Sequence, residues 1–350
     1  MATPTLETLS VEQWAVLRQL DRFVRVDLKF DARELCYWYL LRFAIARNFN
    51  VEETKKMLTQ FVQFQRKLAT DKVGQWSPAA ADFQEMRANI NMGLHFTSNN
   101  GTPILIWRLG ESKIKELLKT YTVEQVVYYF VQLGNRFMTI VLPMTSQLNQ
   151  KRTEKLTVIF DLKNTDMMGF LSGKLNEFLK TFAEVGQVFY PNILEKLFMI
   201  NAPMLFSAVW AVFKHFLHPT TQERIEISSG FNKEKIHAAV HPDRLPVWLG
   251  GNSTAPLIDN MGPWKAALEE SYAAGSFYLK DNTPYEDYYY TKEERKSMEK
   301  TMIVAGPVVG IPETRIFSYQ DLEDLSDNIQ IRPLKTTKMV VSMAKANVTD

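Results

Sequence analysis

The hydrophobic pattern at the start of the chain is typical of packed helices. Residues 34–47 are dense in apolar side chains, and after Asn50 apolar residues recur every three or four positions. Asn50 and Glu53 have the spacing of a helix N-cap and its reciprocal acid. We therefore expect a helical N-terminal region over residues 1–92.

The pattern then changes to short apolar runs separated by longer amphipathic stretches. Runs at 103–108, 156–160, 197–200 and 224–228 have the length of strands, and helical patterns lie between them. Strands that alternate with helices need crossover connections, and hence a mostly parallel or mixed sheet. The strands are almost continuously apolar, which indicates a sheet covered on both faces. We expect an α/β domain over residues 93–258.

The pattern changes once more near residue 260. Tyrosines cluster at Tyr285 and at 288–290, a short charged segment follows, and the remainder contains scattered prolines. We interpret residues 259–350 as a C-terminal extension that looks partly extended. Extended segments of this kind often bind other proteins, so residues 260–350 are a candidate binding segment for a protein partner.

Composition and charge narrow the functions that this chain can have. The formal net charge is +2, from 41 basic and 39 acidic residues, which lacks the positive excess typical of nucleic-acid binding. The single cysteine, Cys36, cannot form an intramolecular disulfide and is typical of a reducing compartment. The longest apolar run, 205–213, is too short for a bilayer, which requires ~20 residues. We expect a cytoplasmic protein with at most transient membrane association.

The sequence has no motif that predicts catalysis. It contains no GxSxG segment, and no strand is followed by the glycines of a dinucleotide site. His237 and His241 are four residues apart, but Pro242 ends their helix and no third metal ligand is evident. We expect no enzymatic activity, no cofactor and no metal.

The segment 203–217, PMLFSAVWAVFKHFL, is apolar around most of a helix. Such a helix is either fully buried in the core or has apolar material on its second face. The first reading is an ordinary core helix, and the second is a helix that closes a lipid cavity. The residues that would line or close such a cavity are Phe206, Val209, Trp210 and Phe213.

Several segments, in this order and spacing, resemble the CRAL-TRIO lipid-binding family, which includes the yeast-type phosphatidylinositol transfer proteins. They are LLRFAIARNFNVEETKKML (40–58), GTPILIWRLG (101–110), VIFDLKN (158–164), YPNILEKLFMINAPMLFSAVWAVFKHFL (190–217) and LPVWLGG (245–251). The resemblance implies a helical N-terminal region, a mixed sheet that floors an apolar lipid pocket, and a gating helix at 203–217. It raises the lipid-facing interpretation of that helix above the core interpretation.

The resemblance also implies a set of headgroup-binding residues. Family members that bind phosphatidylinositol use an arginine, an acid after a Tyr-Pro pair, a threonine and a lysine. The matching positions here are Arg47, Asn192, Thr221 and Arg224. Three of them can still donate hydrogen bonds to phosphate, but Asn192 brings no charge where an acid is usual.

Members that bind phosphatidylcholine carry a serine and a threonine on the strand before the Asp-Leu-Lys motif. Leu156 and Val158 occupy those positions here, which removes two hydroxyl donors from the pocket interior. We therefore expect a carrier of one phosphoinositide-type lipid. The alternatives are a carrier of a neutral hydrophobe such as a sterol, tocopherol or isoprenoid, and a scaffold subunit that binds partners through its C-terminal extension.

Overall fold

The computed structural model describes residues 4–30, 37–70, 81–171 and 173–274. The chain divides into two compact units, one made of residues 1–15 and 280–350 and the other of residues 16–279. In the first unit, a 3-10 turn (Leu6–Thr8) precedes the beginning of helix α1 (Val11–Arg22). Cys36 and the tyrosine-rich extension lie outside the described residues.

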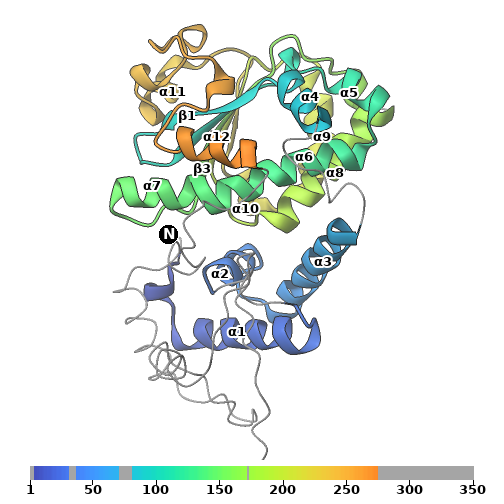
Figure 1. Cartoon of the computed structure of the whole chain (residues 1–350), viewed down its shortest axis with the longest axis vertical. Coiled ribbons are helices and arrows are strands. Elements are labelled where there is room, and N and C mark those ends of the chain that lie inside the picture. Colours follow the sequence, from blue (N-terminus) through green and yellow to red (C-terminus); the bar gives the residue numbers. More distant parts are fainter. Residues whose placement is uncertain (1–3, 31–36, 71–80, 172, 275–350) are drawn as a thin grey trace, which may run out of the picture. The chain divides into compact units, whose positions relative to one another are not determined.

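The second unit contains a helical segment, a sheet and the helices that cover the sheet (Figure 1). Its α-helices after α1 are α2 (Tyr37–Ala46), α3 (Val51–Thr70), α4 (Ala81–Asn89), α5 (Ile114–Thr120), α6 (Val123–Arg136), α7 (Leu142–Asn149), α8 (Gly173–Phe189), α9 (Phe206–Phe213), α10 (Pro219–Gln222), α11 (Lys233–Ala239) and α12 (Lys265–Ala274). Its strands are β1 (Met92–Thr97), β2 (Pro103–Arg108), β3 (Leu156–Asp161), β4 (Leu194–Ile200) and β5 (Ile225–Ile227).

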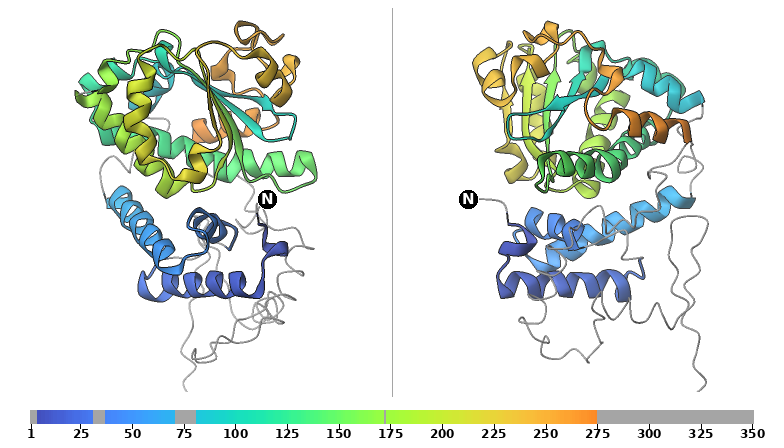
Figure 2. Two further views of the ribbon diagram at one scale, coloured as in Figure 1. Left: turned by 180° about the vertical axis from the view of Figure 1, so that it is seen from behind. Right: turned by 60° about the vertical axis from the view of Figure 1, so that its left-hand side comes forward.

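The five strands form one sheet in the order β1-β2-β3-β4-β5. Strand β1 pairs antiparallel with β2, and the remaining pairs are parallel, so the predicted mixed sheet and α/β class are confirmed. The antiparallel strand β1 was not predicted. A π-helical turn (Phe137–Val141) joins α6 to α7, and Figure 2 shows the three as one continuous green helix.

Local sequence explains where several helices begin. Thr122 and Gln125 form a reciprocal capping box at the start of α6, with the Thr122 amide 2.8 Å from Gln125 Oε1. Asn50 Oδ1 accepts from the Glu53 amide at 3.0 Å at the start of α3, as the sequence predicts.

The two faces of the sheet have different surroundings. Because side chains alternate along a strand, Ile104 and Ile106 face one side of β2 while Leu105 and Trp107 face the other. The first face packs into a closed core with Phe198, Ile200, Ile236, Val240, Leu245, Leu249 and Leu257. The second face borders a cavity.

Residues 259–274 pack against the sheet domain. The Oδ1 atom of Asn260 accepts from the Leu94 amide at 3.0 Å, and the Met261 carbonyl accepts from the Phe96 amide at 2.6 Å. Trp264, just before α12, is fully buried, and Arg136 Nε lies 3.1 Å from Ser271 Oγ on α12. This packing extends the domain past the predicted boundary at residue 258, through α12.

Candidate functional site

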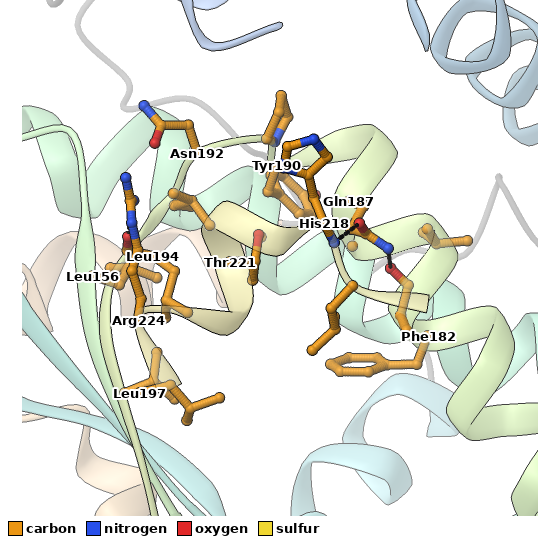
Figure 3. Close-up of a pocket in the computed structure, with 18 of the residues that line it drawn as sticks. Leu156, Phe182, Gln187, Tyr190, Asn192, Leu194, Leu197, His218, Thr221 and Arg224 are labelled. Atoms are coloured by element: carbon orange, nitrogen blue, oxygen red, sulfur yellow. Dashed lines mark hydrogen bonds between the residues drawn. The ribbon is translucent and has the colours of Figure 1, made fainter. Parts of the chain in front are cut away.

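The cavity beside the sheet has a volume of about 350 Å³. The sheet side of its wall is formed by Leu105, Trp107, Leu156, Val158, Phe160, Leu197 and Met199. The helices α6 and α8 contribute Val127, Phe130, Val131, Gly134, Phe182, Ala183 and Gly186. Figure 3 shows Leu197 and Phe182 at one end of this space, and Asn192, His218 and Gln187 at the other.

The interior of the cavity is lined by aromatic and other apolar side chains. Trp107 contacts Phe130, Phe160 and Phe182 with ring-centroid separations of 5.0, 5.2 and 5.7 Å. The Trp107 indole N–H donates to Ser112 Oγ at 3.0 Å and so does not need a partner in the cavity. This end of the cavity is suited to hydrocarbon.

The opposite end is polar, and we call it the polar end. Its lining residues are Arg47, Asn48, Gln187, Asn192, His218, Thr220, Thr221 and Arg224. No aspartate or glutamate is present among the described residues that line the cavity. The formal charge of the wall is therefore positive, contributed by Arg47 and Arg224.

The structure brings the four predicted headgroup residues to this one cavity. Arg47 is half-buried, its Nη1 donates to the Ala46 carbonyl at 2.9 Å, and burial lowers the pKa of its guanidinium. Arg224 Nη1 donates to the Leu194 carbonyl, which holds the side chain against the start of β4. Asn192 and Thr221 complete the set. Their role in binding stays a prediction.

Asn192 has a backbone conformation that bears on its identity. Its φ is +55°, in the left-handed region that asparagine tolerates far better than most residues. Tyr190, two residues earlier, is anchored through its hydroxyl, which lies 2.6 Å from the Val131 carbonyl oxygen and 3.0 Å from Asn135 Oδ1. The turn that carries Asn192 is thus fixed to α6.

The predicted pocket and gate residues divide into two groups. Leu156, Val158 and Phe213 line the cavity, whereas Phe206, Val209 and Trp210 are not among its lining residues. Phe206 stacks on Trp210 with centroids 6.2 Å apart. The prediction for the gating helix is therefore corrected: of its four predicted cavity residues, only Phe213 lines the described cavity wall.

The predicted helix 203–217 is shorter in the structure and has two faces. A turn precedes α9, and Lys214–Phe216 continues as a 3-10 turn, since Pro219 begins the next helix. Phe206 and Val209 are buried, but Met204 is 94% exposed and Leu205 and Val212 are 50% and 44% exposed. The interpretation of this segment as an ordinary core helix is therefore wrong.

Four residues of the polar end, Asn48, Gln187, His218 and Thr220, were not identified from the sequence. Gln187 Oε1 accepts from the His218 amide at 3.0 Å, which joins the end of α8 to the start of α10 (Figure 3). A lone glutamine in a helix has no recognisable pattern. The position of His218 just before Pro219 and the predicted Thr221 was the available signal.

Residues 88–251 match the model of the CRAL/TRIO domain. The resemblance seen in the sequence is thereby confirmed. The chain is 24% identical over 277 residues to the phosphatidylinositol/phosphatidylcholine transfer protein SFH11 of Arabidopsis thaliana, covering 75% of this chain and 73% of that protein. It is 29% identical over 231 residues to the SEC14 cytosolic factor of Yarrowia lipolytica, covering 65% and 46%.

Two further comparisons concern the share of a relative's length that the chain covers and the fold. The chain spans 40% of the length of Arabidopsis thaliana SFH14, to which it is 29% identical over 234 residues. The crystal structure of Sfh5 superposes with a TM-score of 0.50 at 15% identity, covering 76% of this chain and 98% of that one, which supports the fold. Within the described residues, no helix is both long and apolar enough to cross a bilayer.

Proposed function

We propose that this chain is a non-enzymatic lipid-transfer protein that holds one anionic phospholipid of the phosphoinositide type. The observation that carries the proposal is the division of one cavity into an aromatic, apolar interior and a polar end with two arginines and no lining carboxylate among the described residues. The transfer proteins of Arabidopsis thaliana named above support lipid exchange as the activity.

The apolar interior supplies the affinity for acyl chains. Each methylene buried away from water contributes ~0.8 kcal/mol, so a closable hydrocarbon cavity can compete with a bilayer for one lipid. Leu156 and Val158 both line the interior, where an unpartnered phosphate would lose its hydration without compensation. The headgroup therefore belongs at the polar end.

The polar end supplies the selection for charge. Arg47 and Arg224 are permanent cations with planar groups of donors suited to phosphate, and Thr221 adds a hydroxyl donor. The amide of Asn192 can donate to a phosphate or accept from a sugar hydroxyl. This set favours anionic phospholipids over phosphatidylcholine, whose quaternary ammonium would meet positive charge.

The exposed apolar surface of α9 and of the turn before it supports transient contact with a membrane. Met204, Leu205 and Val212 present apolar surface to solvent, and an interfacial environment would cover that surface. Lipid exchange requires such contact, because the ligand has to enter the cavity from a bilayer.

A second candidate is a carrier of a neutral hydrophobe, which the aliphatic wall at Leu156 and Val158 favours. The two candidates differ in their dependence on the arginines. We would load the purified protein from mixed vesicles that contain phosphatidylinositol, phosphatidylcholine and a sterol, and identify the bound lipid by native mass spectrometry. Arg47→Gln and Arg224→Lys are the test variants, and Arg22→Gln, an exposed arginine outside the cavity lining, is the matched control.

We expect Arg47→Gln to lower phosphatidylinositol uptake roughly tenfold or more, because a hydrogen bond to a charged group contributes ~1.5–3 kcal/mol. Arg224→Lys keeps the positive charge, so its phosphatidylinositol uptake should fall less than that of Arg47→Gln. Arg22→Gln should behave as the parent. Loading with sterol in all variants, with no phospholipid in any, would replace the first candidate with the second.

A further inference from the structure

His218 is a titratable lining residue that none of the predicted headgroup contacts includes. It is the N-cap of α10 and its backbone amide is held by Gln187. Its Nδ1 lies 2.9 Å from Thr220 Oγ1 and accepts from the Thr220 amide at 3.4 Å. Because Nδ1 acts as an acceptor, the neutral ring carries its proton on Nε2, which has no hydrogen-bond partner within the described residues.

The charged group nearest in effect to His218 is Arg47. Burial lowers the pKa of the His218 imidazole, and the positive charge of Arg47, in the turn after α2, lowers it further. The other neighbours are neutral: α8 contributes the Gln187 amide, and α10 itself contributes the Thr220 hydroxyl. The phenol of Tyr190 also lines the cavity, and burial keeps it protonated by raising its pKa.

No carboxylate offsets this pair within the described cavity wall. Glu53 is the acid whose field reaches Arg47, but its own carboxylate is bonded to Lys56 at 2.7 Å. A cation and a protonatable ring that are both partly buried, with no lining acid, favour an anion between them.

We propose that His218 is a further headgroup-binding residue, which together with Arg47 holds the phosphate of an anionic lipid at the polar end of the cavity. The inference rests on the proposed lipid-binding function. Nε2–H donates to a phosphate oxygen, while Thr220 orients the ring and Gln187 holds the His218 backbone before the lipid arrives.

The assignment couples binding to proton uptake. In the empty protein burial and Arg47 keep His218 neutral near pH 7, whereas a phosphate beside the ring favours the imidazolium and raises its pKa. A group whose pKa is higher in the complex adds affinity that is fully present below its free pKa and is lost as pH rises through its bound pKa. Affinity for an anionic lipid should therefore rise as pH falls.

The test follows the His218 ring by NMR titration of the full chain, alone and after incubation with phosphatidylinositol vesicles, phosphatidylcholine vesicles, or inorganic phosphate. Lipid uptake is measured in parallel between about pH 5.5 and 7.5, the range in which histidine changes charge. His218→Gln is the test variant. His215→Gln is the matched control, since His215 is exposed, lies three residues away and is not among the lining residues.

We expect phosphatidylinositol to raise the pKa of His218 by about one unit, with about tenfold tighter uptake at the acidic end of the range. His218→Gln should flatten this dependence, and His215→Gln should keep it. An equal pKa rise with inorganic phosphate would show a soluble-anion site and would overturn the lipid assignment. Phosphatidylinositol uptake that does not depend on pH, with no change in the pKa of His218, would refute this inference but not the proposed function. The absence of uptake of any anionic lipid would refute the proposed function.

Discussion

Gly134 is the position at which one added methyl group should disturb the cavity most. It lies on α6 in the cavity wall, directly under the ring of Tyr190. A Cβ atom at this position would lie 2.2 Å from Tyr190 Cζ and 2.5 Å from its hydroxyl oxygen. Ordinary contacts begin near 3.4 Å, so the ring has to move by about 1.2 Å, the difference between 3.4 and 2.2 Å.

The movement breaks the anchor of the turn that carries Asn192. The Tyr190 hydroxyl would leave the Val131 carbonyl, now 2.6 Å away, which costs roughly 2 kcal/mol for a buried polar group. Overpacking adds roughly 2 kcal/mol. Alanine is a better helix former than glycine by roughly 1 kcal/mol, which offsets part of this. We expect Gly134→Ala to lower the free energy of unfolding by about 3 kcal/mol and to weaken lipid uptake.

Gly186→Ala is a matched control on the facing helix. Gly186 also lines the cavity, but a Cβ atom there meets no other atom within 4 Å. The same substitution should therefore stabilise the protein by up to roughly 1 kcal/mol through helix propensity. Urea denaturation and vesicle uptake of both variants provide the comparison. Equal unfolding free energies for the two variants would refute the assigned role of the Gly134–Tyr190 contact.

Three further perturbations have expected outcomes. His95 is fully buried without a hydrogen-bond partner in the described structure, and burial lowers its pKa to about 4, so it takes up a proton on unfolding below pH 6.5. Its contribution to the free energy of unfolding should fall by about 3 kcal/mol between pH 6.5 and 4. The unfolding free energy of His95→Leu should therefore depend less on pH than that of the parent, and an equal pH dependence of the two proteins would contradict this. Truncation after residue 258 removes the buried Trp264, Leu268 and Tyr272, whose burial contributes on the order of 5–9 kcal/mol. Calorimetry should show no cooperative unfolding of the chain truncated after residue 258, whereas a chain that ends at residue 279 should keep the melting temperature of the parent. Asn192→Gly and Asn192→Ala should lose lipid affinity equally, but Asn192→Ala alone should lose roughly 1–2 kcal/mol of stability because of its positive φ; equal stabilities would argue against strain at this turn.

The hydrophobic pattern of the sequence was sufficient to predict the central strands, because most of their residues are apolar and buried. Strands β2 and β3 and the second half of β4 are mostly apolar and mostly buried, and such runs are visible without a structure. Strand β1 was missed because it contains Gly93, His95 and a register shift, so its apolar residues do not alternate regularly. Besides its hairpin partner β2, it bonds to residues far away in sequence, including the carbonyl of Met261.

The packing of residues 259–274 on the sheet domain was not expected from the sequence, for a related reason. Residues that pack on Tyr272 of α12 come from α4 and α6, and no local pattern links them to it. Arg136 illustrates the difficulty, since a basic residue in the last turn of a helix is usually exposed. Here it is fully buried against Tyr272, at 4.8 Å from the ring centroid, and bonds to Ser271.

The candidate site shows the same division between what a sequence encodes locally and what the fold brings together. The resemblance was enough to name Arg47, Asn192, Thr221 and Arg224, but it does not explain why position 192 is an asparagine. The structure offers two physical reasons that act in the same direction. A left-handed φ favours asparagine at the turn, and an acid at this position would add a negative charge to a described cavity wall that has none. Such an acid would accept from inositol hydroxyls, but it would also repel a phosphate bound at the polar end. Under the proposed function, we expect a headgroup recognised chiefly through its phosphate, with the charge state of His218 adjusting the strength of that recognition.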